Sequence, residues 1–310
     1  MVKWECLGIY IQPALNARRL WGYIIVYGII YNGGLCNKGQ KNIVIQGAGF
    51  ANKTSPIIGS IMSEKAAVVL AAGKGTRMKS DLPKVLMPVC GRPMIDYVLD
   101  ALISGGIEKI IAVIGYRAEL VKAALDGRKN LAFAMQTEQL GTGHAVMCCR
   151  ELLADHHGPV LVVAGDAPLM QTKSVAALLA AYDRKPAACI MGTAFTDNPM
   201  GLGRIIRDKQ GNFLGIVEHR DATAEQRKIQ EVNMSYYVFN CQDVFHALDY
   251  IRPDNDQGEY YITDVPRVLI SRGLEVRALP VLQPCEALSI NNVEELAVVE
   301  AEMRRMKDKG

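Results

Sequence analysis

The sequence lacks the residue patterns that mark disulfide frameworks and zinc sites. Its eight cysteines contain no Cys-x-x-Cys pair and follow no regular spacing. No His-x-x-x-His pair or Cys/His cluster stands beside them, which excludes the usual zinc sites. We therefore expect free thiols and a cytoplasmic location, because the reducing cytoplasm keeps cysteines unpaired.

The sequence also lacks a strong charge imbalance and a long apolar run. Its net charge of +3 at pH 7 is too small to indicate a nucleic-acid partner. The apolar run over residues 20–31 is shorter than the roughly 20 residues of a membrane-spanning helix. We expect neither nucleic acid nor a membrane as a partner, and nothing in the sequence indicates an oligomeric state.

Residues 1–61 differ in composition from the rest of the chain. They hold both tryptophans and four of the twelve tyrosines. Arg18-Arg19 before the apolar run suggest a signal-like segment, but no small-x-small cleavage pattern follows. Because Met62 directly precedes the first strand-like run, we expect residues 1–61 to be a poorly ordered extension or to lie outside the native domain. Residues 62–310 then form the functional domain.

Short apolar runs alternate with amphipathic segments after Met62. The pattern predicts strands over residues 66–70, 109–114, 131–135, 160–164 and 187–192, and helices over 95–103, 118–125, 144–153 and 175–182. Such alternation is typical of an α/β protein with a doubly wound, mostly parallel sheet and right-handed crossovers.

The rhythm changes after about residue 193. Shorter strands are predicted over residues 204–207, 213–217, 234–239 and 276–279, and helices over 261–271 and 293–306. We expect a smaller β-rich part that extends the sheet and covers the site.

A glycine-rich loop follows the first apolar run, with the sequence Leu70-Ala-Ala-Gly-Lys-Gly-Thr-Arg-Met78. Gly73 and Gly75 let backbone N–H groups approach an anion, and Arg77 and Lys84 add positive charge. The loop matches neither a Walker A loop nor a dinucleotide fingerprint. It predicts a phosphate site, and the alternative is a tight turn with solvated charges.

Three more polar segments follow predicted strands, namely residues 136–143, 165–168 and 289–292. Ligands of open parallel sheets bind at the carboxyl ends of the strands, so these segments and the glycine loop should meet at one edge. Asp166 and the amide oxygen of Asn291 would suffice for Mg²⁺, which completes its coordination with water and phosphate.

Each of these polar residues also has a structural interpretation. Asp166 could brace a turn, Gln136 could end a surface strand, and His144 could simply pack at a helix start. The pair Asn291-Asn292 could cap the last helix. The coincidence of four such features at one sheet edge favours the functional interpretation.

The ordered set of motifs resembles a known family over nearly 250 residues. It is similar to the uridyltransferase domain of the bifunctional N-acetylglucosamine-1-phosphate uridyltransferase/glucosamine-1-phosphate acetyltransferases. The segments that carry the resemblance are Leu70–Met78, Asp81–Val85, Gln136–Ala145, Gly165–Leu169, Gly203–Ile205, Ile216–Ala222, Ile229–Asn233, Gln257–Asp264 and Asn291–Asn292.

The resemblance implies a Rossmann-like nucleotide-diphospho-sugar transferase fold and a sugar-1-phosphate nucleotidyltransferase. UTP and N-acetylglucosamine 1-phosphate would give UDP-N-acetylglucosamine, a cell-wall precursor, and pyrophosphate, with Mg²⁺ assisting in-line attack on the α-phosphate. The nucleotide-binding part would span about residues 62–192 and the sugar-binding part about 193–310.

The resemblance also implies roles for single residues. The nucleotide would be bound by Leu70, Ala71, Ala72, Gly73, Gly75, Thr76, Arg77, Lys84, Gln136, Gly141 and Thr142. Catalysis would rest on Arg77, Lys84 and Asp166, the sugar on Gly203, Glu218 and Asn233, and Mg²⁺ on Asp166 and Asn291.

The sequence departs from the family pattern at the sugar site. Ala164 stands where some members have Tyr, and Met234-Ser235 stand where Thr-Gly is common. A related nucleotidyltransferase for another sugar 1-phosphate or NTP, or a non-catalytic nucleotide-sugar-binding protein, are the alternatives. The β-helix repeats of the acetyltransferase domain are missing, so we expect no acetyl transfer and have no argument for a trimer.

Overall fold

The computed structural model describes residues 63–75, 80–255, 257–290 and 292–308. The predicted extension before Met62 lies outside the described residues, as do Thr76, Arg77 and Asn291. All the following statements concern the described part of the chain.

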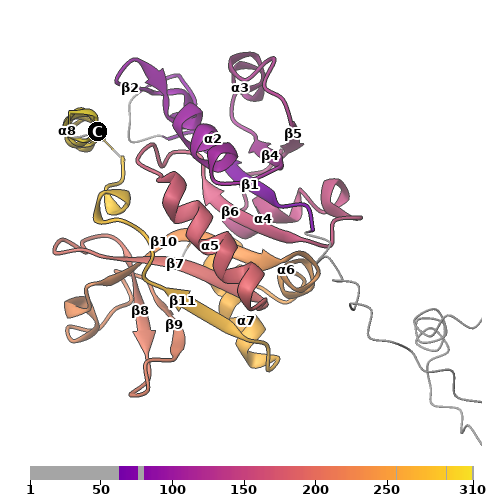
Figure 1. Ribbon diagram of the computed structural model, residues 1–310, viewed down its shortest axis with the longest axis vertical. Helices are drawn as coiled ribbons and strands as arrows, with labels where there is room; N and C mark the ends of the chain where they lie inside the picture. The colour runs from indigo at the N-terminus through magenta and orange to yellow at the C-terminus, as the bar shows by residue number, and fades with distance from the viewer. Residues whose placement is uncertain (1–62, 76–79, 256, 291, 309–310) are drawn as a thin grey trace, which may run out of the picture. The chain divides into compact units, whose positions relative to one another are not determined.

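A mixed sheet of nine strands organises these residues, in the order β11-β7-β10-β6-β1-β4-β5, with β8 paired to β10 and β9 paired to β8 (Figure 1). The strands are β1 (Ala66–Ala71), β4 (Lys109–Ile114), β5 (Leu131–Met135), β6 (Pro159–Ala164), β7 (Cys189–Phe195), β8 (Gly203–Arg207), β9 (Phe213–Val217), β10 (Glu231–Asn240) and β11 (Val276–Leu279). Strands β5, β4, β1 and β6 are parallel, and β11 is parallel to β7, whereas β10 runs antiparallel to both β6 and β7.

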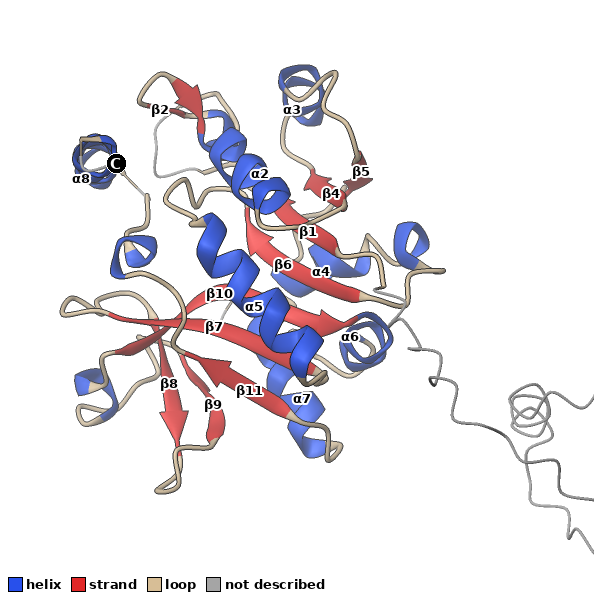
Figure 2. Cartoon of the chain, in the orientation of Figure 1, coloured by secondary structure: helices blue, strands red, loops and turns tan. Residues whose placement is uncertain are grey.

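Helices cover both faces of the sheet (Figure 2). One face holds α2 (Met94–Ser104), α3 (Ala118–Ala124) and α5 (Thr172–Arg184), and the other holds α4 (Thr142–Met147), α6 (Cys241–Leu248) and α7 (Val265–Ser271). The last helix, α8 (Val293–Lys307), packs against the short hairpin of β2 (Pro88–Val89) and β3 (Arg92–Pro93), where Glu300 Oε1 accepts a hydrogen bond of 2.7 Å from Cys90 N.

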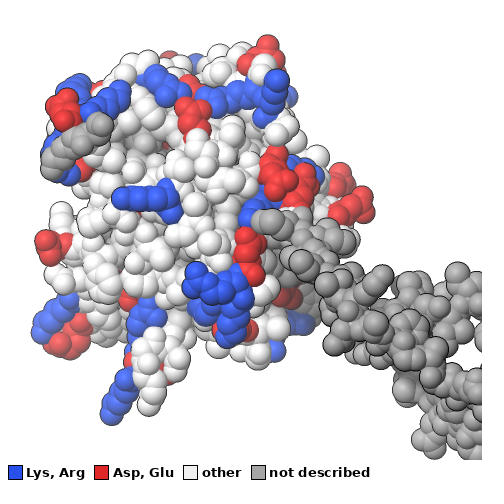
Figure 3. Space-filling view, in the orientation of Figure 1, with Lys and Arg blue, Asp and Glu red and all other residues white. Residues whose placement is uncertain are grey.

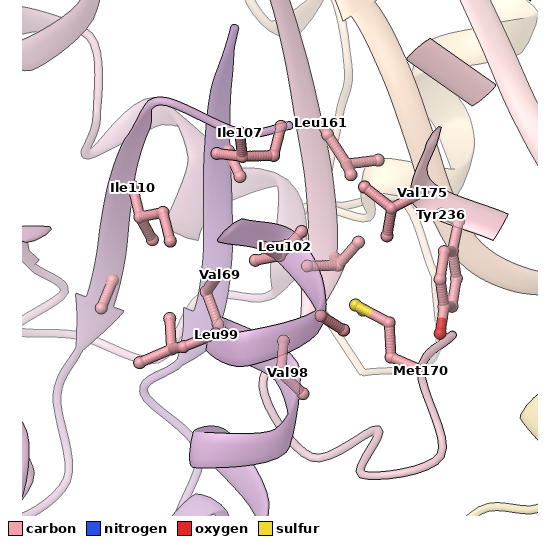
Figure 4. Close-up of a cluster of buried hydrophobic side chains, with 14 of the residues drawn as sticks. Val69, Val98, Leu99, Leu102, Ile107, Ile110, Leu161, Met170, Val175 and Tyr236 are labelled. Carbon is pink, nitrogen blue, oxygen red and sulfur yellow. The ribbon is translucent and has the colours of Figure 1, made fainter. Parts of the chain in front are cut away.

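The two-residue period of β1 explains how a single strand builds both layers. Ala67, Val69 and Ala71 lie in the cluster that packs on α2 and α5, whereas Ala66 and Val68 lie in the cluster that packs on α4, α6 and α7. All five are buried. Figure 4 shows the first cluster, with Val69 beneath the side chains of α2. A strand that is apolar on both faces is typical of the centre of a doubly wound sheet.

The predicted doubly wound, mostly parallel sheet is therefore confirmed. The domain division near residue 192 stays a prediction, and the strands on both sides of this residue share one sheet.

The predicted helices differ from the observed ones at two places. The predicted helix over 144–153 is wrong beyond Met147, because a turn and the 3-10 helix η3 (Glu151–Leu153) replace it while Val146, Cys149 and Leu153 remain buried. The helix α6 was missed, although its N-cap, Asn240, accepts hydrogen bonds from two backbone N–H groups, as an N-cap asparagine commonly does.

A partly buried ion pair joins the β-rich part to the rest of the sheet. The Arg207 guanidinium on β8 donates from Nε and Nη2 to the two carboxylate oxygens of Glu231 on β10, at 2.7 and 2.6 Å. Thr193 Oγ1 on β7 donates to the same carboxylate at 2.6 Å, and Arg207 Nη2 also donates to Ala278 O on β11 at 2.8 Å. Four strands are thus tied together by one bidentate pair.

Replacing Arg207 with Gln should therefore lower the free energy of unfolding by about 3 kcal/mol, because the buried Glu231 carboxylate loses its counter-charge. Urea unfolding followed by circular dichroism measures the change. Lys122→Gln, which breaks the exposed pair with Glu119, is the control and should change stability by less than about 0.5 kcal/mol. Equal stability of the two variants would contradict this account of the Arg207 pair.

Candidate functional site

The glycine loop at the end of β1 packs closely against Lys84. Gly75 has φ +67°, and a Cβ atom at this position would lie 2.7 Å from Lys84 Cβ. Only glycine meets both demands, because other residues rarely adopt this conformation and have no space for their side chain here. The loop predicted to bind phosphate therefore lies in contact with the lysine predicted to add charge.

Lys84 forms an ion pair with Asp166 at the carboxyl ends of β1 and β6. Lys84 Nζ lies 2.5 Å from Asp166 Oδ2, and both side chains are partly exposed, at 18% and 28%. Gly165 N donates to Leu70 O at 2.9 Å, which places Asp166 directly beside the end of β1. A cation and a carboxylate thus stand together where a ligand of this sheet should bind.

Gln136 is buried next to the glycine loop, so the interpretation as an exposed strand end is wrong. It is 3% exposed, and its Nε2 lies 3.0 Å from Gly141 O and 3.1 Å from His144 Nδ1. A Cβ on Gly115 would lie 2.7 Å from Gln136 O and 3.0 Å from Ala72 Cβ. The ends of β1, β4 and β5 therefore converge at Gln136.

The loop of Gly141 and Thr142 is held in place by the segment 259–262. Gly143 N donates to Tyr260 O at 2.7 Å, and Thr142 Oγ1 accepts from Ile262 N at 3.0 Å. Gly141 has φ +105°, and a Cβ here would lie 2.6 Å from Tyr260 O. The docked loop fixes both residues beside Gln136.

The three predicted sugar residues meet at the edge of β8, β9 and β10. A Cβ on Gly203 would lie 3.4 Å from Glu218 Oε1 and 3.6 Å from Asn233 Cβ. Asn233 is buried and its Nδ2 donates to Tyr237 Oη at 2.8 Å. Because β10 runs against β6, the start of β10 lies at the edge where β6 ends. The three residues therefore lie close together, and their role in binding a sugar stays a prediction.

Glu218 borders a cavity of about 440 Å³. The charged side chains of Asp221, Asp264 and Arg267 line the same cavity. Burial raises the pKa of Glu218, and the nearby carboxylates of Asp221 and Asp264 raise this pKa further. Burial also raises the pKa of Asp264, while Arg267 opposes that rise. The described residues contain no hydrogen-bond donor to the Glu218 carboxylate. The cavity therefore presents acceptors that suit the hydroxyl groups of a ligand.

Sequence reasoning assigned no role to Asp221, Tyr261 or Asp264, although all three line this cavity. Tyr261 and Asp264 lie in the segment Gln257–Asp264, whose motif contributed to the resemblance, and Asp221 follows Glu218 by three residues. The signal was present in the sequence, but only the folded chain shows that both segments border one cavity.

Asp166 is the described residue that suits a divalent cation at the carboxyl edge. Within the described ranges there is no group of three or more His, Cys, Asp or Glu that could hold a metal ion. One hard carboxylate fits Mg²⁺, which often takes few protein ligands. Asn292 caps α8, with Oδ1 accepting from Glu295 N at 2.8 Å, so the capping interpretation is right for this residue.

Two observations concern the molecule as a whole and not the site. Acidic and basic side chains are interspersed around the face seen in Figure 3, and the middle of that face is mostly uncharged. Among the described residues, no helix combines the length and apolarity that crossing a membrane requires.

Residues 67–229 match the family of MobA-like NTP transferase domains. The chain is 45% identical to the bifunctional protein GlmU of Pelotomaculum thermopropionicum over 240 residues, which cover 77% of this chain and 52% of that protein. It is 46% identical to the bifunctional protein GlmU of Streptococcus thermophilus over 244 residues, with coverages of 78% and 52%. The chain thus spans about half the length of the curated relatives it matches, and the resemblance stated above is confirmed.

A solved structure shares the fold. The crystal structure of UDP-glucose pyrophosphorylase complexed with UDP-glucose superposes with a TM-score of 0.63 at 18% identity, covering 78% of this chain and 99% of that one. This likeness confirms the predicted Rossmann-like nucleotide-diphospho-sugar transferase fold.

The raised pKa of Glu218 makes a prediction about stability. A carboxyl group whose pKa is higher in the folded than in the unfolded state lowers stability progressively as pH rises through the interval between the two values. Glu218→Gln removes this titration, so the variant should be more stable than the parent at about pH 8 and lose this advantage at about pH 4. Urea unfolding at both pH values measures the difference.

The exposed Glu225, paired with Lys228 on the surface, provides the control for this experiment. Glu225→Gln should show no comparable gain at either pH. A Glu218→Gln protein that is less stable than the parent at the higher pH would refute the argument.

Proposed function

Since the chain belongs to the family of MobA-like NTP transferase domains, we propose that it joins UTP and N-acetylglucosamine 1-phosphate to form UDP-N-acetylglucosamine and pyrophosphate. Its membership makes it a nucleotidyltransferase, and the particular substrates are our inference. The observation that carries the proposal is the contact of the glycine loop with Lys84, and of Lys84 with Asp166 at 2.5 Å.

The reaction forms a bond between a phosphate oxygen of the sugar phosphate and the α-phosphorus of UTP. The bond from the α-phosphorus to the bridging oxygen breaks, and that electron pair leaves with pyrophosphate. The attacking oxygen is already anionic, so no general base is needed. Catalysis consists of positioning and of neutralising charge, as in other phosphoryl and nucleotidyl transfers.

Lys84 is proposed to supply fixed positive charge beside the α-phosphate, and the backbone N–H groups of Ala71 to Gly75 to hold the phosphates. The resemblance implies that Arg77 supplies charge for the departing pyrophosphate. Asp166, with Asn291, is proposed to hold Mg²⁺, which when bound neutralises phosphate charge.

Gln136 is proposed to recognise uracil. Its Nε2 already faces Gly141 O and His144 Nδ1, so its Oε1 is available to accept a hydrogen bond. The N3–H of uracil is a donor, and cytosine has no hydrogen at this position. The buried amide therefore favours UTP over CTP, because cytosine would leave Oε1 unpaired.

Gly203, Glu218 and Asn233 are proposed to hold the sugar hydroxyls and the acetamido group. Ser235 supports this assignment, although the family commonly has glycine there. Ser235 has φ +58°, a conformation that glycine adopts without strain, and it lies where β10 shifts register. The backbone shape that a glycine would give is thus retained.

Ala164 favours a second candidate, a nucleotidyltransferase for another sugar 1-phosphate. This residue ends β6 beside the site, and its methyl group cannot replace a contact made by a tyrosine. The substrate panel below distinguishes the two candidates, and a non-catalytic nucleotide-sugar-binding protein would show no turnover at all.

Pyrophosphate release by the full chain, measured with Mg²⁺ and a panel of NTPs and sugar 1-phosphates, should be fastest for UTP with N-acetylglucosamine 1-phosphate. Lys84→Ala should lower kcat by about 10²–10³-fold, because one preorganised charge on the reacting phosphate is lost. Lys122→Ala is the matched control on an exposed helix. Release with no pair of substrates would refute the enzyme, and a preference for another sugar would refute only the substrate.

The ion pair also makes a prediction that needs no turnover. Lys84 neutralises Asp166 in the described structure, so it competes with any cation for this carboxylate. Lys84→Gln should therefore raise the affinity for Mn²⁺ in the absence of nucleotide, measured by electron paramagnetic resonance, even though it lowers activity. An unchanged or weaker Mn²⁺ affinity would contradict the assignment of Asp166 to the cation.

A further inference from the structure

Glu286 is a buried carboxylate that the proposed chemistry does not use. It lies in the 3-10 helix η6 (Pro284–Ala287) and is 3% exposed. No ion pair with Glu286 exists among the described residues. A carboxylate removed from water in this way requires several good hydrogen bonds to remain in the fold.

Three donors meet this requirement, and they come from two segments of the chain. Glu286 Oε1 accepts from Gln171 N at 3.0 Å, and Oε2 accepts from Ser174 Oγ at 2.6 Å and from Gln283 N at 2.7 Å. Gln283 belongs to the segment of Glu286 itself, whereas Gln171 and Ser174 lie at the start of α5. The carboxylate thus connects η6 to the residues that follow β6.

The residues between Asp166 and Gln171 form one braced turn. Met170 N donates to Ala167 O at 3.1 Å, and Gln171 Nε2 donates to Leu169 O at 2.7 Å. One end of this turn is fixed where Gly165 N bonds to the end of β1. The other end is the Gln171 N–H that bonds to Glu286. A displacement at Gln171 is therefore transmitted to Asp166 through a short turn with internal hydrogen bonds.

An apolar contact holds the same two segments together. Leu169 from the turn and Ile290 from the segment after η6 lie in one buried cluster with Val89, Met94 and Val299. Met170 lies on the opposite side, close to Tyr236 in Figure 4. Burial and the adjacent charge of Glu286 raise the pKa of Tyr236. Apolar packing keeps the two segments in contact, whereas the directional hydrogen bonds of Glu286 define the position of the turn.

We propose that Glu286 is a positioning residue that orients Asp166 toward its divalent cation by holding the turn 166–171 through the Gln171 N–H. The inference rests on the proposed function of Asp166. Glu286 itself touches neither the cation nor the substrates. Residues that orient a metal ligand from outside the coordination shell commonly change metal affinity or activity 10–100-fold when substituted.

The test compares two variants of the full chain that both remove a hydrogen bond from this cluster. Glu286→Gln replaces one acceptor oxygen by an NH₂ group and removes the negative charge, so the bond from the Gln171 N–H is weakened or lost in either orientation of the amide. Ser174→Ala removes a bond to the same carboxylate but leaves the Gln171 N–H in place. Mn²⁺ affinity is measured by electron paramagnetic resonance with a non-hydrolysable UTP analogue present, so that turnover is not required.

Glu286→Gln should weaken Mn²⁺ binding about tenfold and raise the Mg²⁺ concentration for half-maximal activity by a similar factor. KM for UTP at saturating Mg²⁺ should remain unchanged. Ser174→Ala should leave Mn²⁺ affinity within about twofold of the parent. A purely structural role would instead lower the unfolding temperature of both variants and leave Mn²⁺ affinity unaltered, which would overturn the proposal.

Two further outcomes are informative. If Glu286→Gln does not fold, Glu286→Asp, which keeps both oxygens but retracts them by one methylene group, should weaken Mn²⁺ binding in the same direction, and an unchanged affinity would refute the role. If the parent protein binds no Mn²⁺ with the UTP analogue, the proposed cation site fails and this inference fails with it. Normal binding by the parent and by Glu286→Gln refutes the positioning role alone.

Discussion

The antiparallel placement of β10 between β6 and β7 is the constraint on which the candidate site depends. Ten residues long, β10 pairs with β6, β7 and β8, so it joins the parallel strands to the β-rich part. Because its direction is reversed, its first residues lie where the parallel strands end. Asn233 and Gly203, which pair across β10 and β8, therefore come to the edge that already holds Asp166. A parallel β10 would carry them to the opposite edge.

The segment 259–264 connects the two halves of the site in a different way. At one end, Tyr260 bonds to the loop that flanks Gln136, and at the other end Asp264 lies close enough to Glu218 to raise its pKa. A change in the position of Gly141 would thus displace the segment 259–264 and alter the cavity beside Glu218. The proposed nucleotide pocket and the proposed sugar pocket share this segment as one wall, which suits the proposed reaction, in which two substrates must meet at a single phosphorus atom.

Much of this arrangement could be predicted from the sequence, because it rests on local patterns. The apolar runs of β1, β4, β5 and β6 alternate with amphipathic segments, and this pattern predicts a doubly wound sheet. Ligands of such sheets bind at the carboxyl ends of the strands, so Lys84, Gln136 and Asp166 are expected to lie together. The family resemblance added Gly203, Glu218 and Asn233, which local patterns alone do not relate to one another. Their common location depends on the register of β8, β9 and β10.

The remaining features depend on contacts between distant residues and had no local signal. Glu286 lies over a hundred residues from Ser174, and its burial follows from how η6 docks on α5. The helix α6 was missed because its apolar stripe is short and it begins directly at the end of β10, where strand and helix patterns merge. The early end of α4 was missed because Cys149 and Leu153 remain buried in a non-helical path, so the apolar spacing was satisfied without a helix.

The left-handed Ser235 has a consequence for engineering this protein. A serine held at φ +58° is strained in the folded molecule, because its side chain crowds the backbone in this conformation. Selection for heat resistance would therefore favour glycine at this position, whereas selection for turnover would be indifferent to the exchange or oppose it. Selection for heat resistance and selection for turnover therefore need not favour the same residue at position 235.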